Sequence, residues 1–160
     1  MSSPAPLRWT CAPLDELSPR ALYEALALRS QVFVVEQNCV FLDPDGDDPR
    51  EGALHLLGHG PAGELQVYAR LLAPNCRGPH QPNPRITRVV SSPAFRGTGL
   101  GPVLMQRAIA ECESRWPGFC IDINAQAQLQ RFYEGQGFAV TSEPYDEDGI
   151  LHIDMRRQPR

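Results

Sequence analysis

The 160-residue sequence contains no lysine, so its fifteen basic side chains are all arginine. This excludes enzymes that form a Schiff base on a lysine amine, pyridoxal phosphate enzymes among them. Acidic residues number nineteen, the net charge is −4, and no run of basic residues of the kind that binds nucleic acid or an anionic membrane is present. We therefore expect no nucleic-acid or membrane partner, and arginine is the only basic side chain available for phosphate groups.

Long apolar runs and closely spaced cysteines are also lacking. No apolar run reaches the ~18 residues that span a membrane, and residues 1–6 do not show the basic and then apolar order of a secretory signal. The five cysteines are odd in number, widely spaced and free of any C-x-x-C pair, which argues against a disulfide framework or a zinc site. We expect a cytoplasmic protein with no bound metal.

The pattern of apolar residues predicts a mixed sheet with helices, an α/β or α+β layered fold. The length is typical of one domain, so we assign residues 1–160 to a single domain with a loose N-terminal end at 1–7. Helices are expected from Ser18 to about 33, with a break near 32–35, from 100 to about 116, and from 126 to 136. Strands are expected at 8–12, 53–57, 64–72, 86–91, 119–123, 138–141 and 150–155. The total is about seven strands and four helices.

The segment Arg96-Gly97-Thr98-Gly99-Leu100-Gly101 joins the predicted strand 86–91 to an amphipathic helix. Three glycines at every second position remove side chains and let backbone N–H groups approach a ligand closely. The N-terminus of the following helix adds unpaired N–H groups and the positive end of a dipole, both of which attract phosphate. Arg96 adds a fork of charged donors. The sequence therefore predicts a pyrophosphate site in this glycine-rich loop.

Two other phosphate-binding motifs do not fit the loop. A dinucleotide fingerprint requires G-x-G-x-x-G, but Pro102 stands at the third glycine position, and a Walker loop requires a lysine. A nucleotide-binding module of another fold stays open as an alternative, and stabilisation by NAD or ATP but not by coenzyme A would support it.

A second loop, Asp43 to Asp47, has the acidic spacing of a calcium site but departs from the pattern. Its glycine stands at the fourth place instead of the sixth, and Leu54 replaces the glutamate at the twelfth. We expect a tight turn here and no metal.

The hexapeptide at 96–101 fills the fixed places of Arg-x-x-Gly-x-Gly and so resembles the coenzyme A pyrophosphate loop of the GNAT superfamily of N-acetyltransferases. Within that superfamily, further segments resemble the ElaA group. These segments are 28–39, 55–56, 68–71, 88–91, 125–127, 132–138 and 147–153. The resemblance covers nearly the whole chain, from about Trp9 to Met155.

The resemblance implies a GNAT-like acyl-CoA N-acyltransferase fold and acetyl transfer from acetyl-CoA to a primary amine, by direct attack in a ternary complex. It further implies which residues hold the co-substrate. The strand before the loop would pair with the pantetheine arm, and the loop would bind pyrophosphate. Gln126 stands where many relatives have asparagine, and Asn124, two residues earlier, is the alternative amide for the co-substrate. The implied cofactor-binding residues are Val89, Val90, Ser91, Arg96, Gly97, Thr98, Gly99, Leu100, Gly101 and Gln126.

Candidates for proton transfer lie outside the loop. Tyr133 is the candidate general acid, because a phenol pKa near 10 suits a thiol leaving group; the alternative is an aromatic ring packed on its helix. Glu36, whose pKa burial would raise, and His152, which titrates near neutrality, are candidates for the general base. Deprotonation relayed by water is the alternative to both. Arg29, Glu36 and Gln37 are the candidates for the acceptor pocket.

The acceptor is left open as a primary amine of a small molecule or peptide. The acidic residues between 143 and 148 would either attract a cationic acceptor or form a solvated loop. A non-catalytic acyl-CoA-binding or regulatory domain is the alternative function. Exposed edges of the C-terminal strands are compatible with a homodimer.

Overall fold

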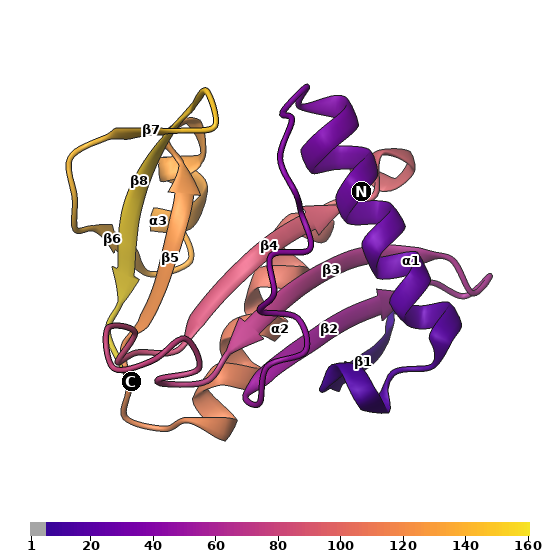
Figure 1. Ribbon diagram of the computed structural model, residues 1–160, viewed down its shortest axis with the longest axis horizontal. Coiled ribbons are helices and arrows are strands. Elements are labelled where there is room, and N and C mark those ends of the chain that lie inside the picture. The colour runs from indigo at the N-terminus through magenta and orange to yellow at the C-terminus, as the bar shows by residue number, and fades with distance from the viewer. Residues whose placement is uncertain (1–5) are drawn as a thin grey trace.

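The computed structural model describes residues 6–160, so residues 1–5 of the predicted loose end lie outside the described part. Eight strands form one sheet in the order β1-β2-β3-β4-β5-β8-β6, and β7 pairs separately with β8 (Figure 1). The strands are β1 Arg8–Ala12, β2 Ala53–His59, β3 Leu65–Leu72, β4 Arg85–Ser91, β5 Ile121–Gln126, β6 Phe138–Val140, β7 Tyr145–Glu147 and β8 Ile150–Arg157. The helices are α1 Pro19–Arg29, α2 Leu100–Arg115 and α3 Gln130–Glu134, with a π-helix, η2, at Ser30–Glu36. Short 3-10 turns stand at Leu14–Glu16 (η1), Pro93–Phe95 (η3) and Ala127–Leu129 (η4).

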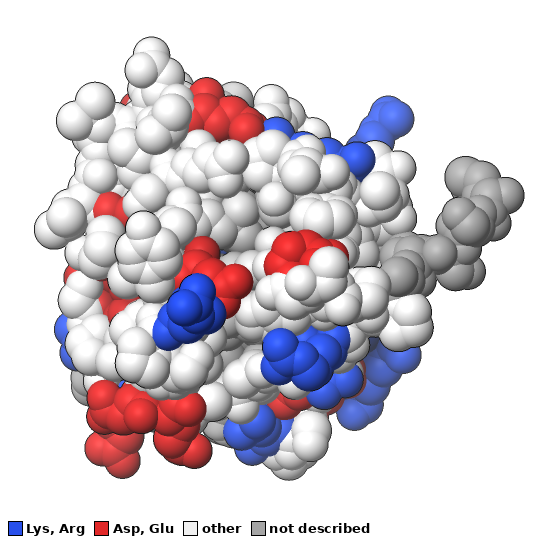
Figure 2. Space-filling model, turned by 90° about the vertical axis from the view of Figure 1, so that its right-hand side faces the viewer, with Lys and Arg blue, Asp and Glu red and all other residues white. Residues whose placement is uncertain are grey.

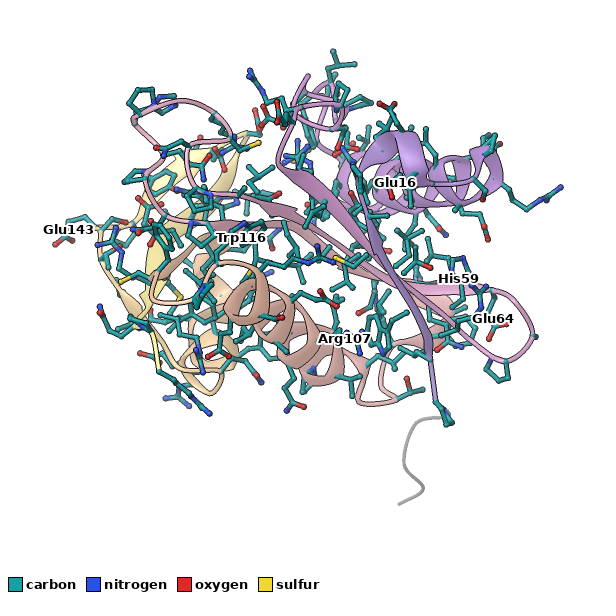
Figure 3. The ribbon with its side chains drawn as sticks, turned by 90° about the horizontal axis from the view of Figure 1, so that it is seen from below. Glu16, His59, Glu64, Arg107, Trp116 and Glu143 are labelled. Carbon is teal, nitrogen blue, oxygen red and sulfur yellow. The ribbon has the colours of Figure 1, made fainter. Side chains whose placement is uncertain are left out.

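Strand β3 is buried on both faces because helices cover both sides of the sheet. Val67, Ala69 and Leu71 belong to the core beneath α2, whereas the intervening Tyr68 belongs to a second cluster beneath α1. This follows from the period of two, which turns successive strand side chains to opposite faces. Figure 3 shows α2 below the sheet, with Arg107 and Trp116 on that side.

The N-terminal ends of α1 and α2 are defined by local hydrogen bonds and backbone conformation. Ser18 Oγ accepts a hydrogen bond of 3.0 Å from the Ala21 N–H, and Pro19 stands at the first position of α1, where a missing N–H costs nothing. Helix α2 instead begins after Gly99, whose φ of 83° lies in the left-handed region that glycine adopts freely.

The predicted fold is confirmed, with corrections to its elements: within residues 6–160, eight strands and three α-helices, with the π-helix η2 after α1, replace the predicted seven strands and four helices. The seven predicted strands are present, and the eighth, β7, was missed because its three residues show no apolar alternation. The helix predicted for 126–136 is wrong in extent. Strand β5 continues to Gln126, which pairs with His152 of β8, and α3 begins only at Gln130.

Strands β4 and β5 are the parallel pair in the sheet, and they separate soon after they meet. A single register pair, Arg85 with Asp122, joins them. Their N-terminal ends lie side by side in Figure 1, and the two ribbons then diverge towards the top of the view. This divergence leaves a wedge in the sheet between the two strands.

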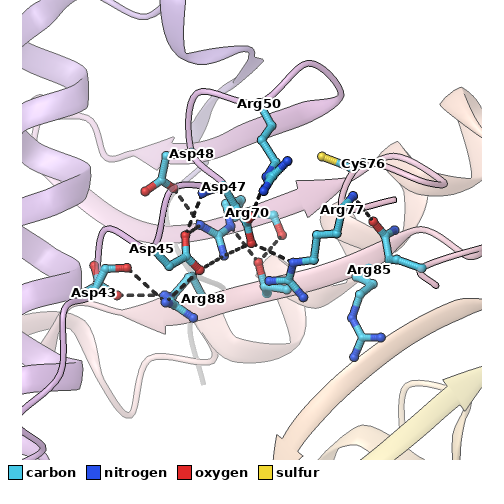
Figure 4. A network of polar contacts seen from close by, with 12 residues as sticks. Asp43, Asp45, Asp47, Asp48, Arg50, Arg70, Cys76, Arg77, Arg85 and Arg88 are labelled. Carbon is cyan, nitrogen blue, oxygen red and sulfur yellow. Dashed lines mark hydrogen bonds and ion pairs between the residues drawn. The ribbon is translucent and has the colours of Figure 1, made fainter. Parts of the chain in front are cut away.

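The loop predicted as a tight turn near Asp43 is a densely paired ion network (Figure 4). Arg29 and Arg70 are fully buried, and each pairs with Asp48, at 2.7 and 2.9 Å respectively. Arg70 also pairs with Asp45 at 2.8 Å. Burial alone would raise the pKa of Asp48, but its hydrogen bonds and charge contacts with the two arginines outweigh that effect and lower it. The network fixes the segment between η2 and β2 over one face of the sheet.

Charges elsewhere on the surface are of both signs. On the side that carries α1 and β1, basic and acidic groups are interspersed (Figure 2). Among residues 6–160, no helix is long and apolar enough to cross a membrane, and no group of His, Cys, Asp and Glu could hold a metal ion.

Candidate active site

A cavity of about 670 Å³ lies at the wedge between β4 and β5. This volume falls within the range of roughly 300–1,000 Å³ typical of small-molecule sites. Its walls come from η2, the segment after it, β4, the start of α2, β5, α3 and the β7–β8 hairpin. The cavity therefore joins segments from both halves of the chain.

Strand β4 carries a β-bulge on the cavity wall. Tyr68 pairs with Val90 and Arg70 pairs with Thr87, so Arg88 and Val89 together face the single residue Ala69. The φ of Arg88 is 54°, a left-handed value that a long side chain rarely adopts. A bulge leaves one residue outside the ladder and turns its neighbours. Three predicted pantetheine contacts line the cavity, namely Val89 in the bulge and Val90 and Ser91 after it.

The glycine-rich loop stands at the start of α2, as its sequence predicts. Gly97 and Gly99 have φ values of 79° and 83°, and Gly99 offers no side-chain cap to the helix. The N–H groups of the first helical turn therefore keep their capacity to bind an anion. Arg96 and Gly101 line the cavity, Gly97, Thr98 and Gly99 are exposed, and Leu100 is buried in the core.

Glu36 lies beside this loop, in contrast to the buried position expected for it. Its side chain is 42% exposed, and its carboxylate pairs with Arg96 at 2.5 Å. The expectation that burial would prepare Glu36 as a base is therefore wrong. Its neighbour Gln37 does line the cavity, as predicted.

Tyr133 packs against neighbouring aromatic rings and also lines the cavity. Its ring makes edge contacts with Phe132 at 5.0 Å and Phe138 at 6.1 Å between centroids. Burial raises the pKa of the Tyr133 phenol to about 12. Tyr133 therefore keeps its proton throughout the physiological pH range, and it is a weaker acid than the phenol of pKa near 10 on which the prediction was based.

His152, on β8, also lines the cavity. Its Nδ1 lies 2.8 Å from the Ile150 carbonyl oxygen, which can only accept a hydrogen bond. Nδ1 therefore carries the proton in the neutral ring, and Nε2 keeps its lone pair. Nε2 lies 3.6 Å from the Glu147 carboxylate, and the ring stacks on Tyr145 at 6.2 Å.

Two amides of β5 line the cavity, and the structure gives them different partners. The Asn124 side-chain oxygen accepts a hydrogen bond from Arg85, and its amide nitrogen donates to Tyr145 and Asp154. Both polar atoms of this amide therefore have protein partners. The Gln126 carbonyl accepts a hydrogen bond of 3.1 Å from Gln128, and its amide nitrogen has no protein partner among the described residues. Gln126 is therefore the better placed of the two to meet the co-substrate.

Arg29 does not line the cavity, and we withdraw it from the acceptor pocket. It is fully buried, and Asp43 and Asp48 occupy its guanidinium. The prediction missed Arg88 and Asp45, which do line the cavity. Arginines within otherwise apolar strand patterns, together with four aspartates at 43–48, were the available signal for this network.

The wedge in the sheet, the bulged strand before it and the uncapped glycine-rich start of α2 define an acyl-CoA N-acyltransferase fold. Residues 63–159 match the family model described as an acetyltransferase (GNAT) domain. The chain belongs to the GNAT family of acetyltransferases.

Within that family, the resemblance to the ElaA group is confirmed. Protein ElaA of Escherichia coli is 41% identical over 153 residues, covering 95% of this chain and 97% of that protein. Its crystal structure gives a TM-score of 0.85 over 95% of this chain and 99% of the other. An acyl-CoA N-acyltransferase from Pseudomonas aeruginosa, 44% identical, gives a TM-score of 0.87 over 94% of this chain and 99% of that one.

Proposed function

We propose that the protein transfers the acetyl group of acetyl-CoA to a primary amine of a small molecule or peptide, by direct attack in a ternary complex. The observation that carries the proposal is the cavity itself. It brings the bulged strand β4, the start of the glycine-rich loop and the protonated Tyr133 to one space. These are the parts that thioester activation, pyrophosphate binding and thiolate protonation need.

The glycine-rich loop would bind the pyrophosphate of the co-substrate. Arg96 supplies charge, and the first N–H groups of α2 supply donors at the positive end of the helix dipole. Bound acetyl-CoA supplies the acetyl thioester. Its reacting end would then reach the wedge, where the backbone of Val89 to Ser91 lines the wall.

The bulged part of β4 would polarise the thioester carbonyl. A backbone N–H near Val90 or Ser91, held in place before the reaction, stabilises the negative charge that develops on the carbonyl oxygen. Tyr133 would donate its proton to the departing thiolate. A thiol leaving group needs a donor that is still protonated when the bond breaks, and burial keeps the Tyr133 phenol in its protonated form.

His152 is the preferred base for the acceptor amine. Its Nε2 keeps a lone pair, whereas the Glu36 carboxylate is engaged by Arg96. The acceptor would enter between Gln37 and the β7–β8 hairpin, whose Glu147 and Asp148 also line the cavity. The two acids favour an amine that carries a positive charge.

A thiol-release assay tests the proposal. Acetyl-CoA is incubated with a panel of amines, polyamines, amino acids and peptides, and free thiol and acetylated product are measured. We expect at least one amine to give both, with Tyr133→Phe lowering the rate. Thermal stabilisation by CoA without thiol release for any amine would instead indicate a non-catalytic acyl-CoA-binding domain.

A further inference from the structure

The backbone of Arg88, in the β4 bulge, adopts a conformation that is unfavourable for a residue with a long side chain. Its φ of 54° belongs to the left-handed region, where glycine, asparagine and aspartate are commoner. Residues in such positions persist only where surrounding contacts determine them. The contacts of the Arg88 side chain are therefore the place to look for what fixes the bulge.

Asp43 supplies most of those contacts (Figure 4). Arg88 Nε donates to Asp43 Oδ1 at 2.8 Å, and Arg88 Nη2 donates to the Asp43 carbonyl oxygen at 3.0 Å. Arg88 Nη2 also donates to Asp45 Oδ2 at 3.2 Å, and the guanidinium lies over the Phe41 ring, 5.8 Å from its centroid. One residue thus holds the guanidinium by both its side chain and its backbone.

Asp43 is itself fixed from the other side. Only 2% of its surface is exposed. Arg29 Nε donates to Asp43 Oδ2 at 2.8 Å, and Arg29 Nη2 donates to the Asp43 carbonyl oxygen at 3.1 Å. Arg29 ends helix α1 and is completely buried, so it is a rigid anchor. Asp43 therefore links the end of α1 to the bulge of β4.

The bulge directly precedes the backbone groups that the proposed reaction uses. Val89 shares the bulge with Arg88, and Val90 resumes the ladder opposite Tyr68. The conformation of Arg88 therefore sets the direction in which the next N–H groups point. Donors of this kind act through their fixed position, and a displacement of about 1 Å can lower a rate roughly 100-fold.

We propose that Asp43 is a positioning residue: acting through Arg88, it fixes the β4 bulge and thereby aims the following backbone N–H groups at the thioester carbonyl. This inference rests on the proposed acetyl transfer. It gives the buried aspartate a role in the rate of the reaction, beyond its role in joining the loop to the sheet.

Two variants remove the link from opposite ends. Asp43→Asn keeps the shape of the side chain but removes its charge. Arg88→Gly removes the guanidinium and leaves a residue that can adopt a φ of 54° without strain but is no longer held there by Asp43. Arg50→Gln is the matched control, because Arg50 pairs with Asp47 in the same network but has no contact with β4.

The rate is measured with the best acceptor from the amine panel, together with acceptor-independent hydrolysis of acetyl-CoA. We expect Asp43→Asn and Arg88→Gly to lower kcat by roughly 10- to 100-fold. KM for acetyl-CoA should stay within about twofold because the pyrophosphate loop is untouched. Arg50→Gln should match the wild type. An unchanged kcat in Asp43→Asn or in Arg88→Gly, or an equal loss in Arg50→Gln, would overturn the proposal.

A spectroscopic measurement separates this inference from the proposed function. In wild-type protein, the amide resonances of Val89 and Val90 should differ between the CoA and acetyl-CoA complexes, and the difference should be lost in both Asp43→Asn and Arg88→Gly. If no amine supports acetyl transfer, the proposed function fails, and this measurement still decides the role of Asp43. Amide differences that persist unchanged in Asp43→Asn or in Arg88→Gly would refute it.

Discussion

The Arg96 guanidinium and the Glu36 carboxylate lie 2.5 Å apart and join the glycine-rich loop to the end of η2. Both side chains are more than 40% exposed, so the pair is a surface contact that a ligand can exchange. Arg96 is also the side chain that the proposed function assigns to pyrophosphate. If Arg96 binds the pyrophosphate, its ion pair with Glu36 must weaken or break when the co-substrate binds.

Replacing Glu36 with glutamine should tighten the binding of CoA. An exposed ion pair contributes about 0.2–1 kcal/mol, so its loss from the free protein corresponds to a roughly 1.4- to 5-fold lower Kd. Isothermal titration with CoA at low and high salt measures the effect, which salt should weaken. Glu111→Gln, which removes an acid paired with Arg107 and Arg115 on α2, is the control. Weaker binding in Glu36→Gln would show that Glu36 supports the site and does not compete for Arg96.

Replacing His152 with glutamine should lower kcat by roughly 100-fold or more, the usual contribution of a positioned general base. The side chain lines the cavity, and its Nε2 carries the lone pair of the neutral ring with the Glu147 carboxylate 3.6 Å away, whereas Arg96 holds the Glu36 carboxylate at 2.5 Å. CoA affinity should be retained. Steady-state kinetics of His152→Gln and Glu36→Gln, compared on the same acceptor, measure the two roles. A large loss of kcat in Glu36→Gln, with none in His152→Gln, would show that Glu36 and not His152 is the general base.

Tyr133→Phe should lower kcat while leaving the binding of CoA intact, because the variant removes only the phenolic hydroxyl. The pH dependence provides a second check. The acid must be protonated to act, and a pKa of about 12 keeps Tyr133 protonated at every pH below about 11. Between pH 8 and 10, kcat of the wild type should therefore show no decrease that is caused by Tyr133. A decrease that is present in the wild type and absent from Tyr133→Phe would be such an effect. It would mean that the phenol titrates near its ordinary value.

Asp48→Asn should reduce the free energy of unfolding by about 3–5 kcal/mol, the usual cost of removing one partner from a buried ion pair. Asp48 bonds to both Arg29 and Arg70, which have no exposed surface. Urea denaturation measures the loss. Arg50→Gln, which removes a partly exposed pair of the same loop, should cost less than about 1 kcal/mol. Equal losses in the two variants would contradict the assignment of the buried pairs as the main anchors.

Stability should fall in acid in two steps. Burial lowers the pKa of His55, so the unfolded chain binds a proton more readily than the folded one as pH falls below about 6.5. The lowered pKa of Asp48 adds a second loss below about pH 4, where the unfolded aspartate is protonated first. Urea denaturation from pH 8 to 3 measures both steps. His55→Gln should flatten the first step, and an unchanged slope between pH 6.5 and 5 would contradict the prediction.

The proposed homodimer is a separate prediction. Strand β6 is an outer strand of the sheet, and Val140 on it is 39% exposed. An outer strand with free backbone groups can pair with a second copy. Light scattering after size exclusion should give twice the monomer mass. A monomer across micromolar concentrations would exclude the dimer.

Local patterns in the sequence were sufficient for most of the fold. Apolar alternation located seven strands, and the glycines after β4 located the start of α2. The missed strand β7 had a local signal as well. Asp148 and Gly149, with φ values of 52° and 82°, form the two-residue turn between Glu147 and Ile150 that an Asp-Gly pair favours.

The ion network and the bulge could not be predicted in the same way. The contact between Arg88 and Asp43 joins residues 45 positions apart, and Glu36 meets Arg96 across 60 positions. Neither separation leaves a periodic signal in the sequence. The roles expected for Arg29 and Glu36 changed for this reason, since both depended on partners that only the folded chain brings together.

The most direct test of the central claim is the amine panel with acetyl-CoA, read by free thiol and by mass spectrometry of the product. The account predicts thiol release with an equal amount of N-acetylated amine for at least one acceptor, and a steep loss of both in Tyr133→Phe. Thermal stabilisation by CoA with no thiol release for any amine would contradict it, as would stabilisation by NAD or ATP but not by CoA.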